Sequence, residues 1–202
     1  MPPHQPRALG RRSGTHSSKD VVLIVCSSDE EAEYFRWAAI QLGHYPAPVR
    51  VCSSGALSDM VSLAILTRKE EKAKGSPIDR VWCVATGLLD SQDPDVLALA
   101  ERKRVQIAFS NPSFKVWLAL HHADHASFLD PSSLSAHLTS EYQLPELRGL
   151  FAEAASRAAM LRSDDAALDA DGQPVRTELD FVIDDLLKSM QRFTGDGTTP
   201  TI

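Results

Sequence analysis

The sequence predicts an α/β protein with a parallel four-stranded sheet flanked by helices and a C-terminal helical extension. Two observations favour this class. Four short apolar runs have the character of strands buried on both faces, and a stretch with helical spacing follows each run. The chain has 202 residues, of which 43% are hydrophobic and 24% charged, so it is long enough to bury a sizeable core.

The first expected unit is a central strand over 21–26 followed by a helix. Ser27, Ser28 and Asp29 offer helix-capping side chains, and Glu30 and Glu31 suit the first helical turn. Apolar residues then recur at helical spacing up to Leu42, and Gly43 is placed to end the helix.

The same alternation repeats three times. Strands are expected over 48–52, 81–85 and 105–109, and helices over about 56–74 and 95–104, with a last apolar helix running towards His122. The order implies parallel strands with helices on both faces of the sheet.

Beyond His125 the pattern changes to helices without a strand. Helices are expected over 132–140, 145–162 and 177–193, with an aspartate-rich surface loop over 163–174. The predicted organisation is a disordered basic tail (1–19), an α/β core (20–126), a helical extension (127–194) and a disordered tail (195–202).

Composition narrows the function classes. A net charge of −6 argues against general coating of nucleic acid, although a local basic patch remains compatible with it. Cys26, Cys52 and Cys83 form no C-x-x-C pair, so buried reduced thiols and a cytoplasmic location are expected. No apolar run reaches ~18 residues, so neither a membrane span nor a secretory signal is expected.

The segment 110–122 carries the most information. It joins the fourth strand to an apolar helix through a Ser-Asn-Pro turn, at the sheet edge where α/β proteins place ligands. Hydroxyl, amide and ammonium groups would gather there to bind an anion, and the candidates are Ser27, Ser28, Thr86, Ser110, Asn111 and Lys115. The alternative is that Lys115 points to solvent from the first turn of its helix.

A histidine pair in the same region suggests a second kind of site. On a helix, His121 and His125 would share one face, as two zinc ligands do. No third ligand is evident, and imidazoles that meet the free carbonyls of a helix C-terminus are the simpler interpretation.

Several segments together resemble the RloB family. Residues 110–121 are similar to the family's S-N-P-x-F-E-x-W-x-L-L-H pattern, and residues 25–35 to V-C-E-G-E-x-T-E-x-x-Y-F. Residues 82–88 resemble W-C-V-F-D-x-D, and 177–187 resemble the closing T-x-V-x-x-L-V-x-x-L helix. The resemblance implies a Toprim-like fold, a bacterial source in a phage-defence or restriction locus, and Mg²⁺-dependent nuclease chemistry on acidic side chains.

The chain departs from that pattern at the acidic positions. Ser27, Thr86, Leu88 and Lys115 stand where the family carries carboxylates, which are the oxygen ligands that Mg²⁺ needs. We therefore expect a catalytically degenerate binding or regulatory component that needs no cofactor, with nucleic acid or a defence-system protein as partner.

Two enzyme alternatives stay open. One is an active Mg²⁺-dependent nuclease built on relocated carboxylates such as Glu31 and Asp90. The other is an enzyme adapted to a phosphate-bearing small molecule.

Overall fold

The protein folds around one five-stranded sheet with the order β2-β1-β3-β4-β5. The computed structural model describes residues 20–43, 48–128 and 131–191, so the two predicted disordered tails (1–19 and 195–202) lie outside the described residues. The strands are β1 (Val22–Cys26), β2 (Val49–Val51), β3 (Arg80–Thr86), β4 (Gln106–Asn111) and β5 (Arg176–Thr177).

The four predicted strands are confirmed, and all of them are parallel. The expectation of a strand-free C-terminal part was wrong, because Arg176 and Thr177 pair antiparallel with Asn111 and Ser110 of β4. A two-residue strand is too short for its side-chain alternation to be recognised in a sequence. Only the pairing with β4 defines it.

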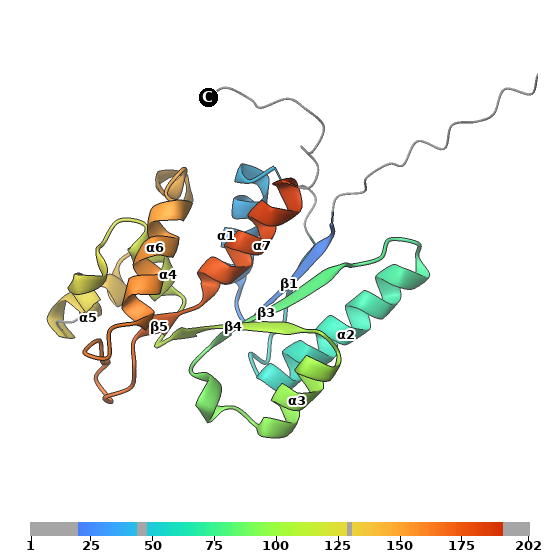
Figure 1. Cartoon of the computed structure of the whole chain (residues 1–202), viewed down its shortest axis with the longest axis horizontal. Helices are drawn as coiled ribbons and strands as arrows, with labels where there is room; N and C mark the ends of the chain where they lie inside the picture. The colour runs from blue at the N-terminus through green and yellow to red at the C-terminus, as the bar shows by residue number, and fades with distance from the viewer. Residues whose placement is uncertain (1–19, 44–47, 129–130, 192–202) are drawn as a thin grey trace, which may run out of the picture.

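Two helices cover one face of the sheet, α2 (Leu57–Ala73) and α3 (Pro94–Arg102). They lie below the sheet in Figure 1 and pack on alternate strand residues such as Leu23, Val25 and Cys83. Both helices end at the edge where β3 and β4 begin, because each helix runs back antiparallel to the strands.

The other face carries α1 (Asp29–Gln41) together with C-terminal helices. α7 (Leu179–Gln191) lies beside α1 above the sheet, and α4 (Lys115–Leu120), α5 (Pro131–Thr139) and α6 (Phe151–Arg162) stand next to them (Figure 1). The buried cluster on this face contains strand residues such as Ile24 and Val84 as well as α7 residues such as Ile183.

The predicted and observed helix boundaries differ most around residue 149. In place of one helix over 145–162, the chain forms a 3₁₀ turn (Leu144–Leu147) and then α6. Gly149 separates them with a φ of +82°, a conformation that interrupts a right-handed helix. Two further 3₁₀ turns, Leu89–Ser91 and His125–Phe128, lie in the connections after β3 and α4.

Polar contacts fasten the C-terminal helices to the sheet and to each other. Asp185 of α7 accepts hydrogen bonds from Arg80 Nη1 (2.6 Å) and Trp82 Nε1 (2.9 Å) of β3. Arg162 of α6 donates to both carboxylate oxygens of Asp180 in α7, at 2.6 and 2.8 Å. No helix in the described part of the chain is long and apolar enough to cross a membrane.

Candidate functional site

The carboxyl ends of β1, β3 and β4 lie side by side, as the sequence predicted. Thr86 is paired with Ser110 in the register, and Cys26 is paired with Val84. Ser27 follows β1 and Thr86 ends β3. Ser110 and Asn111 end β4, and a turn over residues 112–114 leads to Lys115 at the start of α4. This edge of the sheet therefore collects most of the predicted site residues.

Ser27, Ser28 and Glu31 form one closed network at the end of β1. Ser28 caps α1, because its Oγ accepts from the Glu31 backbone N–H and its own N–H donates to the Glu31 carboxylate. Ser27 donates two further hydrogen bonds to the same carboxylate oxygen, one from its backbone N–H (2.7 Å) and one from its hydroxyl (2.8 Å). The predicted capping function of this segment is confirmed.

Glu31 is consequently a buried carboxylate with local partners. Only 2% of it is exposed, and burial raises the pKa of Glu31, against the hydrogen bonds from Ser27 and Ser28 that favour the charged form. Asp90, the other candidate carboxylate, is exposed in the turn after β3 and lines a cavity that Glu31 does not line.

A backbone hydrogen bond joins the ends of β3 and β4 beyond their last paired residues. Thr86 is exposed, and the following Gly87 adopts a φ of +108° while its N–H donates to the Ser110 carbonyl at 3.1 Å. An L side chain rarely adopts this conformation, so glycine suits the turn out of β3. The Thr86 hydroxyl therefore sits at an accessible strand end.

The polar side chains of the Ser-Asn-Pro segment donate hydrogen bonds to backbone carbonyls of the protein itself. Ser110 is buried and its hydroxyl donates to the Ser113 carbonyl at 2.8 Å. Asn111 Nδ2 donates to the Pro174 carbonyl at 2.8 Å, and the Asn111–Pro112 peptide bond is cis. The polar groups of this turn hold β4 to the segment before β5.

Lys115 begins α4, as predicted, and its ammonium is directed into the protein. Nζ donates to the Ser140 carbonyl, which follows α5, at 3.1 Å, and the side chain is half-buried. The alternative in which Lys115 points to solvent was wrong, because the α4–α5 packing places the Ser140 carbonyl within reach of its ammonium.

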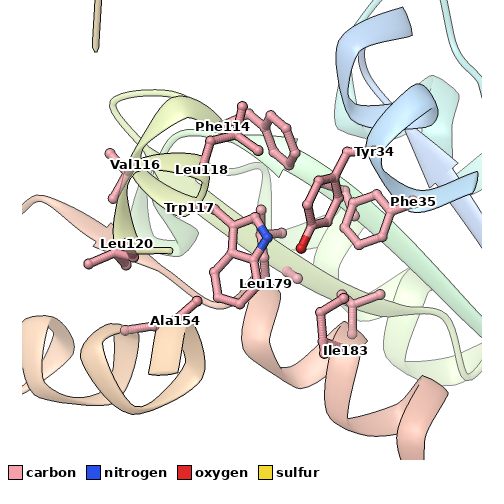
Figure 2. Close-up of a cluster of buried hydrophobic side chains, with 14 of the residues drawn as sticks. Tyr34, Phe35, Phe114, Val116, Trp117, Leu118, Leu120, Ala154, Leu179 and Ile183 are labelled. Atoms are coloured by element: carbon pink, nitrogen blue, oxygen red, sulfur yellow. The ribbon is translucent and has the colours of Figure 1, made fainter. Parts of the chain in front are cut away.

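Beyond Lys115, α4 is buried on every side. Its other five residues are at most 3% exposed, and Trp117 packs against Tyr34 of α1 (Figure 2). A helix that is apolar all round belongs in a core. The apolar part of segment 110–122, including Phe114 and Trp117, is therefore structural.

His121 and His125 do not form the predicted helical pair. α4 ends at Leu120, and His125 begins a separate 3₁₀ turn. Both ring nitrogens of His121 have partners, since Nδ1 lies 3.1 Å from the Trp117 carbonyl and Nε2 lies 3.3 Å from the Tyr34 hydroxyl. No group of three or more His, Cys, Asp or Glu side chains suited to a metal occurs within the described ranges.

Two cavities lie near this edge, and they contain residues that the sequence did not single out. One of about 210 Å³ has Asp90, Arg176 and Glu178 among its lining residues, and one of about 330 Å³ is lined by side chains that include Glu33 and Tyr142. Arg176, Glu178 and Tyr142 come from the C-terminal part of the chain. No local motif marks them, because only the β4–β5 pairing and the α4–α5 packing bring them here.

Comparison with known proteins adds one finding to this geometry. The family model described as "RloB-like protein" matches residues 22–186. The chain belongs to the RloB-like family. No curated protein and no solved structure matches it.

The RloB-like match runs from the first residue of β1 into the last turns of α7. It therefore includes both the sheet and the C-terminal helices that complete its second face. Family membership agrees with the shared buried cluster, in which α6 and α7 residues pack together with β1 and β3 residues.

Proposed function

We propose that this RloB-like protein is catalytically degenerate and acts as a binding or regulatory component of a bacterial phage-defence system. Its partner would be a defence-system protein or nucleic acid. The defence role derives from the resemblance to the RloB family, and the degeneracy derives from the residues at the carboxyl ends of the strands.

One observation carries the proposal. Lys115 stands where the resemblance expects a glutamate, and its ammonium donates to the Ser140 carbonyl. A fixed positive charge at a magnesium-binding position opposes a divalent cation through direct Coulomb repulsion. Replacing a ligand by a cation is therefore more damaging to metal binding than deleting it.

The other three positions support the same conclusion. Ser27 uses its hydroxyl to hold Glu31, and Thr86 and Leu88 carry no charge. Mg²⁺ takes oxygen ligands, mainly carboxylates and water, and stabilises charge on a phosphodiester only when it is held in place. These side chains supply two hydroxyls, one of which already donates to Glu31, where the chemistry needs carboxylates.

The enzyme alternatives have weaker support. A nuclease built on Glu31 and Asp90 needs Glu31 to leave its Ser27 and Ser28 donors, and the two acids have different surroundings. An anion at the strand ends would have to displace the internal partners of Ser110, Asn111 and Lys115, because each of these groups already donates to a carbonyl.

A cleavage assay tests the proposal. Purified full-length protein is incubated with supercoiled plasmid DNA and with RNA, in Mg²⁺ or Mn²⁺, beside the Glu31→Gln and Asp90→Asn variants. We expect no cleavage above the buffer background and no heat of Mg²⁺ binding in calorimetry. Gln keeps the capping geometry of Glu31, so that variant should remain folded.

Co-expression with the products of adjacent genes, followed by size-exclusion chromatography, tests the binding role directly. Co-elution with one of them supports the proposal. Metal-dependent cleavage that disappears in Glu31→Gln or Asp90→Asn would show that the chain is an active nuclease and would overturn it.

A further inference from the structure

We propose that the packed C-terminal ends of α2 and α3 form a surface that binds the phosphate backbone of nucleic acid. We call it the α2–α3 basic surface, and it consists of Arg68, Lys69, Lys72, Arg102 and Lys103. The inference extends the proposed function by naming a partner class and a location. It rests on that function only for the expectation that the bound nucleic acid stays uncleaved.

The surface exists only in the folded chain, because its two halves are at least thirty residues apart in sequence. Arg68 joins them. Its guanidinium donates to the backbone carbonyls of Lys103 and Arg104, just beyond the C-terminus of α3. This contact brings the basic turn of α2 against the basic end of α3.

The remaining cations are free to meet an external anion. Lys69, Lys72, Arg102 and Lys103 are all exposed. None of the five cations forms an ion pair with a carboxylate of the described residues, whereas Lys74, which follows α2, pairs with Glu71. Unpaired positive charge is therefore concentrated on the side of α2 that faces α3.

The nearby acids of α2 are either directed away from this surface or already paired. With about 100° per residue, Arg68, Lys69 and Lys72 fall on the α3-facing and outward sides of α2, and Glu70 falls on the other side. Glu71 lies about 60° from Arg68, but its carboxylate pairs with Lys74. On α3, Glu101 lines a cavity beside Ile107 and so faces away from α2. The cations stand together although the whole chain has a net charge of −6.

A polyphosphate chain fits this arrangement better than a single small anion does. The five charges are spread over two neighbouring helices, so no single phosphate would contact them all. Nucleic acid presents a row of phosphates, and neutralising several of them releases condensed counterions. None of the five residues is aromatic, so we expect backbone binding without base stacking or sequence preference.

The α2–α3 basic surface lies at the opposite end of the sheet from the Ser27–Lys115 edge. α2 and α3 end where β3 and β4 begin, whereas Ser27, Thr86 and Lys115 follow the carboxyl ends of the strands. Binding here would leave the carboxyl edge available to another partner.

Fluorescence anisotropy of the full chain with labelled duplex DNA, single-stranded DNA and RNA tests the inference over a series of salt concentrations. We expect dissociation constants of about 10⁻⁶–10⁻⁴ M and a linear fall of log K with log salt concentration. The triple variant Lys69→Gln, Lys72→Gln, Lys103→Gln should weaken binding roughly tenfold or more and reduce the salt slope by about 3, since each phosphate contact contributes about 0.9. Arg68 is left intact because it holds α2 to α3.

A matched control removes the same charge elsewhere. The variant Lys74→Gln, Arg148→Gln, Lys188→Gln changes three exposed cations outside the surface and should bind within about twofold of the unmodified chain. If both triple variants bound nucleic acid equally weakly, the loss would be explained by net charge alone, and the proposed location would be overturned. So would loss of binding in Arg7→Gln, Arg11→Gln, Arg12→Gln alone, since those residues lie in the N-terminal segment.

Other outcomes separate this inference from the proposed function. Absence of nucleic-acid binding, or binding only to anionic phospholipid vesicles, overturns the inference and leaves the catalytic degeneracy standing. Binding at the surface accompanied by metal-dependent cleavage supports the inference and overturns the degeneracy.

Discussion

At the residue scale, His121 shows how a polar side chain is tolerated inside an apolar cluster. It is 1% exposed and lies among Trp117, Tyr34 and Phe151. The Trp117 carbonyl only accepts, so Nδ1 carries the proton and Nε2 accepts from the Tyr34 hydroxyl. The ring is therefore neutral and fully hydrogen-bonded.

This arrangement predicts a pH-dependent stability. Burial lowers the pKa of His121 to about 4, although its hydrogen bond to the Trp117 carbonyl favours the protonated form. Because the ordinary pKa is about 6.5, the unfolded chain binds a proton first as the pH falls. The folded state should lose on the order of 3 kcal/mol between about pH 6.5 and pH 4, and lose no more from this group below that.

Denaturant unfolding of the unmodified chain and of His121→Gln, from pH 7.5 to 4, checks the prediction. The variant should be less stable at pH 7.5, and the difference should shrink as the pH falls. Parallel loss of stability in the two proteins would contradict the assignment of a buried neutral imidazole.

At the element scale, α7 depends on one polar anchor as well as on its apolar face. Asp185 receives hydrogen bonds from Arg80 and Trp82, and Arg80 also pairs with Asp20 at 3.2 Å. The Asp185 side chain is 15% exposed, so water cannot readily replace its hydrogen bonds to Arg80 and Trp82. A buried charge pair costs most when only one partner is removed.

Asp185→Ala should therefore destabilise the protein by about 2–4 kcal/mol, because it leaves the Trp82 indole N–H without its acceptor and Arg80 with one carboxylate fewer. Asp184→Ala on the same helix is the control. Asp184 is exposed and, among the described residues, its ion-pair partner is Lys188, so we expect a change within about 0.5 kcal/mol. Thermal or denaturant unfolding of both variants measures the difference. Similar losses in the two variants would show that the anchor does not fasten α7.

At the scale of the whole molecule, the predicted α/β core and helical extension share one buried cluster. Leu147, Phe151, Leu161 and Ile183 of the extension pack in the same cluster as strand residues such as Val22. Without the extension, only α1 and α4 would cover this face of the sheet, and parallel sheets are stable with both faces buried.

A fragment that contains residues 20–126 alone should consequently fail to fold cooperatively. We expect weak near-ultraviolet circular dichroism, strong binding of a hydrophobic dye and no sigmoidal thermal transition, in contrast to the full chain. Addition of the 127–202 fragment should restore part of the signal. A sharp transition in the isolated fragment would instead make the core an independent domain.

The sequence by itself determined the α/β class, the four parallel strands, the helices that follow them and the capping of α1. These features depend on apolar periodicity and on side chains within a few residues of one another, which a sequence displays directly. The same local information identified segment 110–122 and aligned it with the RloB family, whose model matches residues 22–186.

Only the tertiary structure decided what the polar groups contact. It paired β5 with β4, directed Lys115 to the Ser140 carbonyl, separated His121 from His125, and brought α2 and α3 together through Arg68. Each of these outcomes joins groups that are distant in sequence or depends on where a helix stops. Such contacts are set by the packing of whole elements, and no local pattern of residues encodes them.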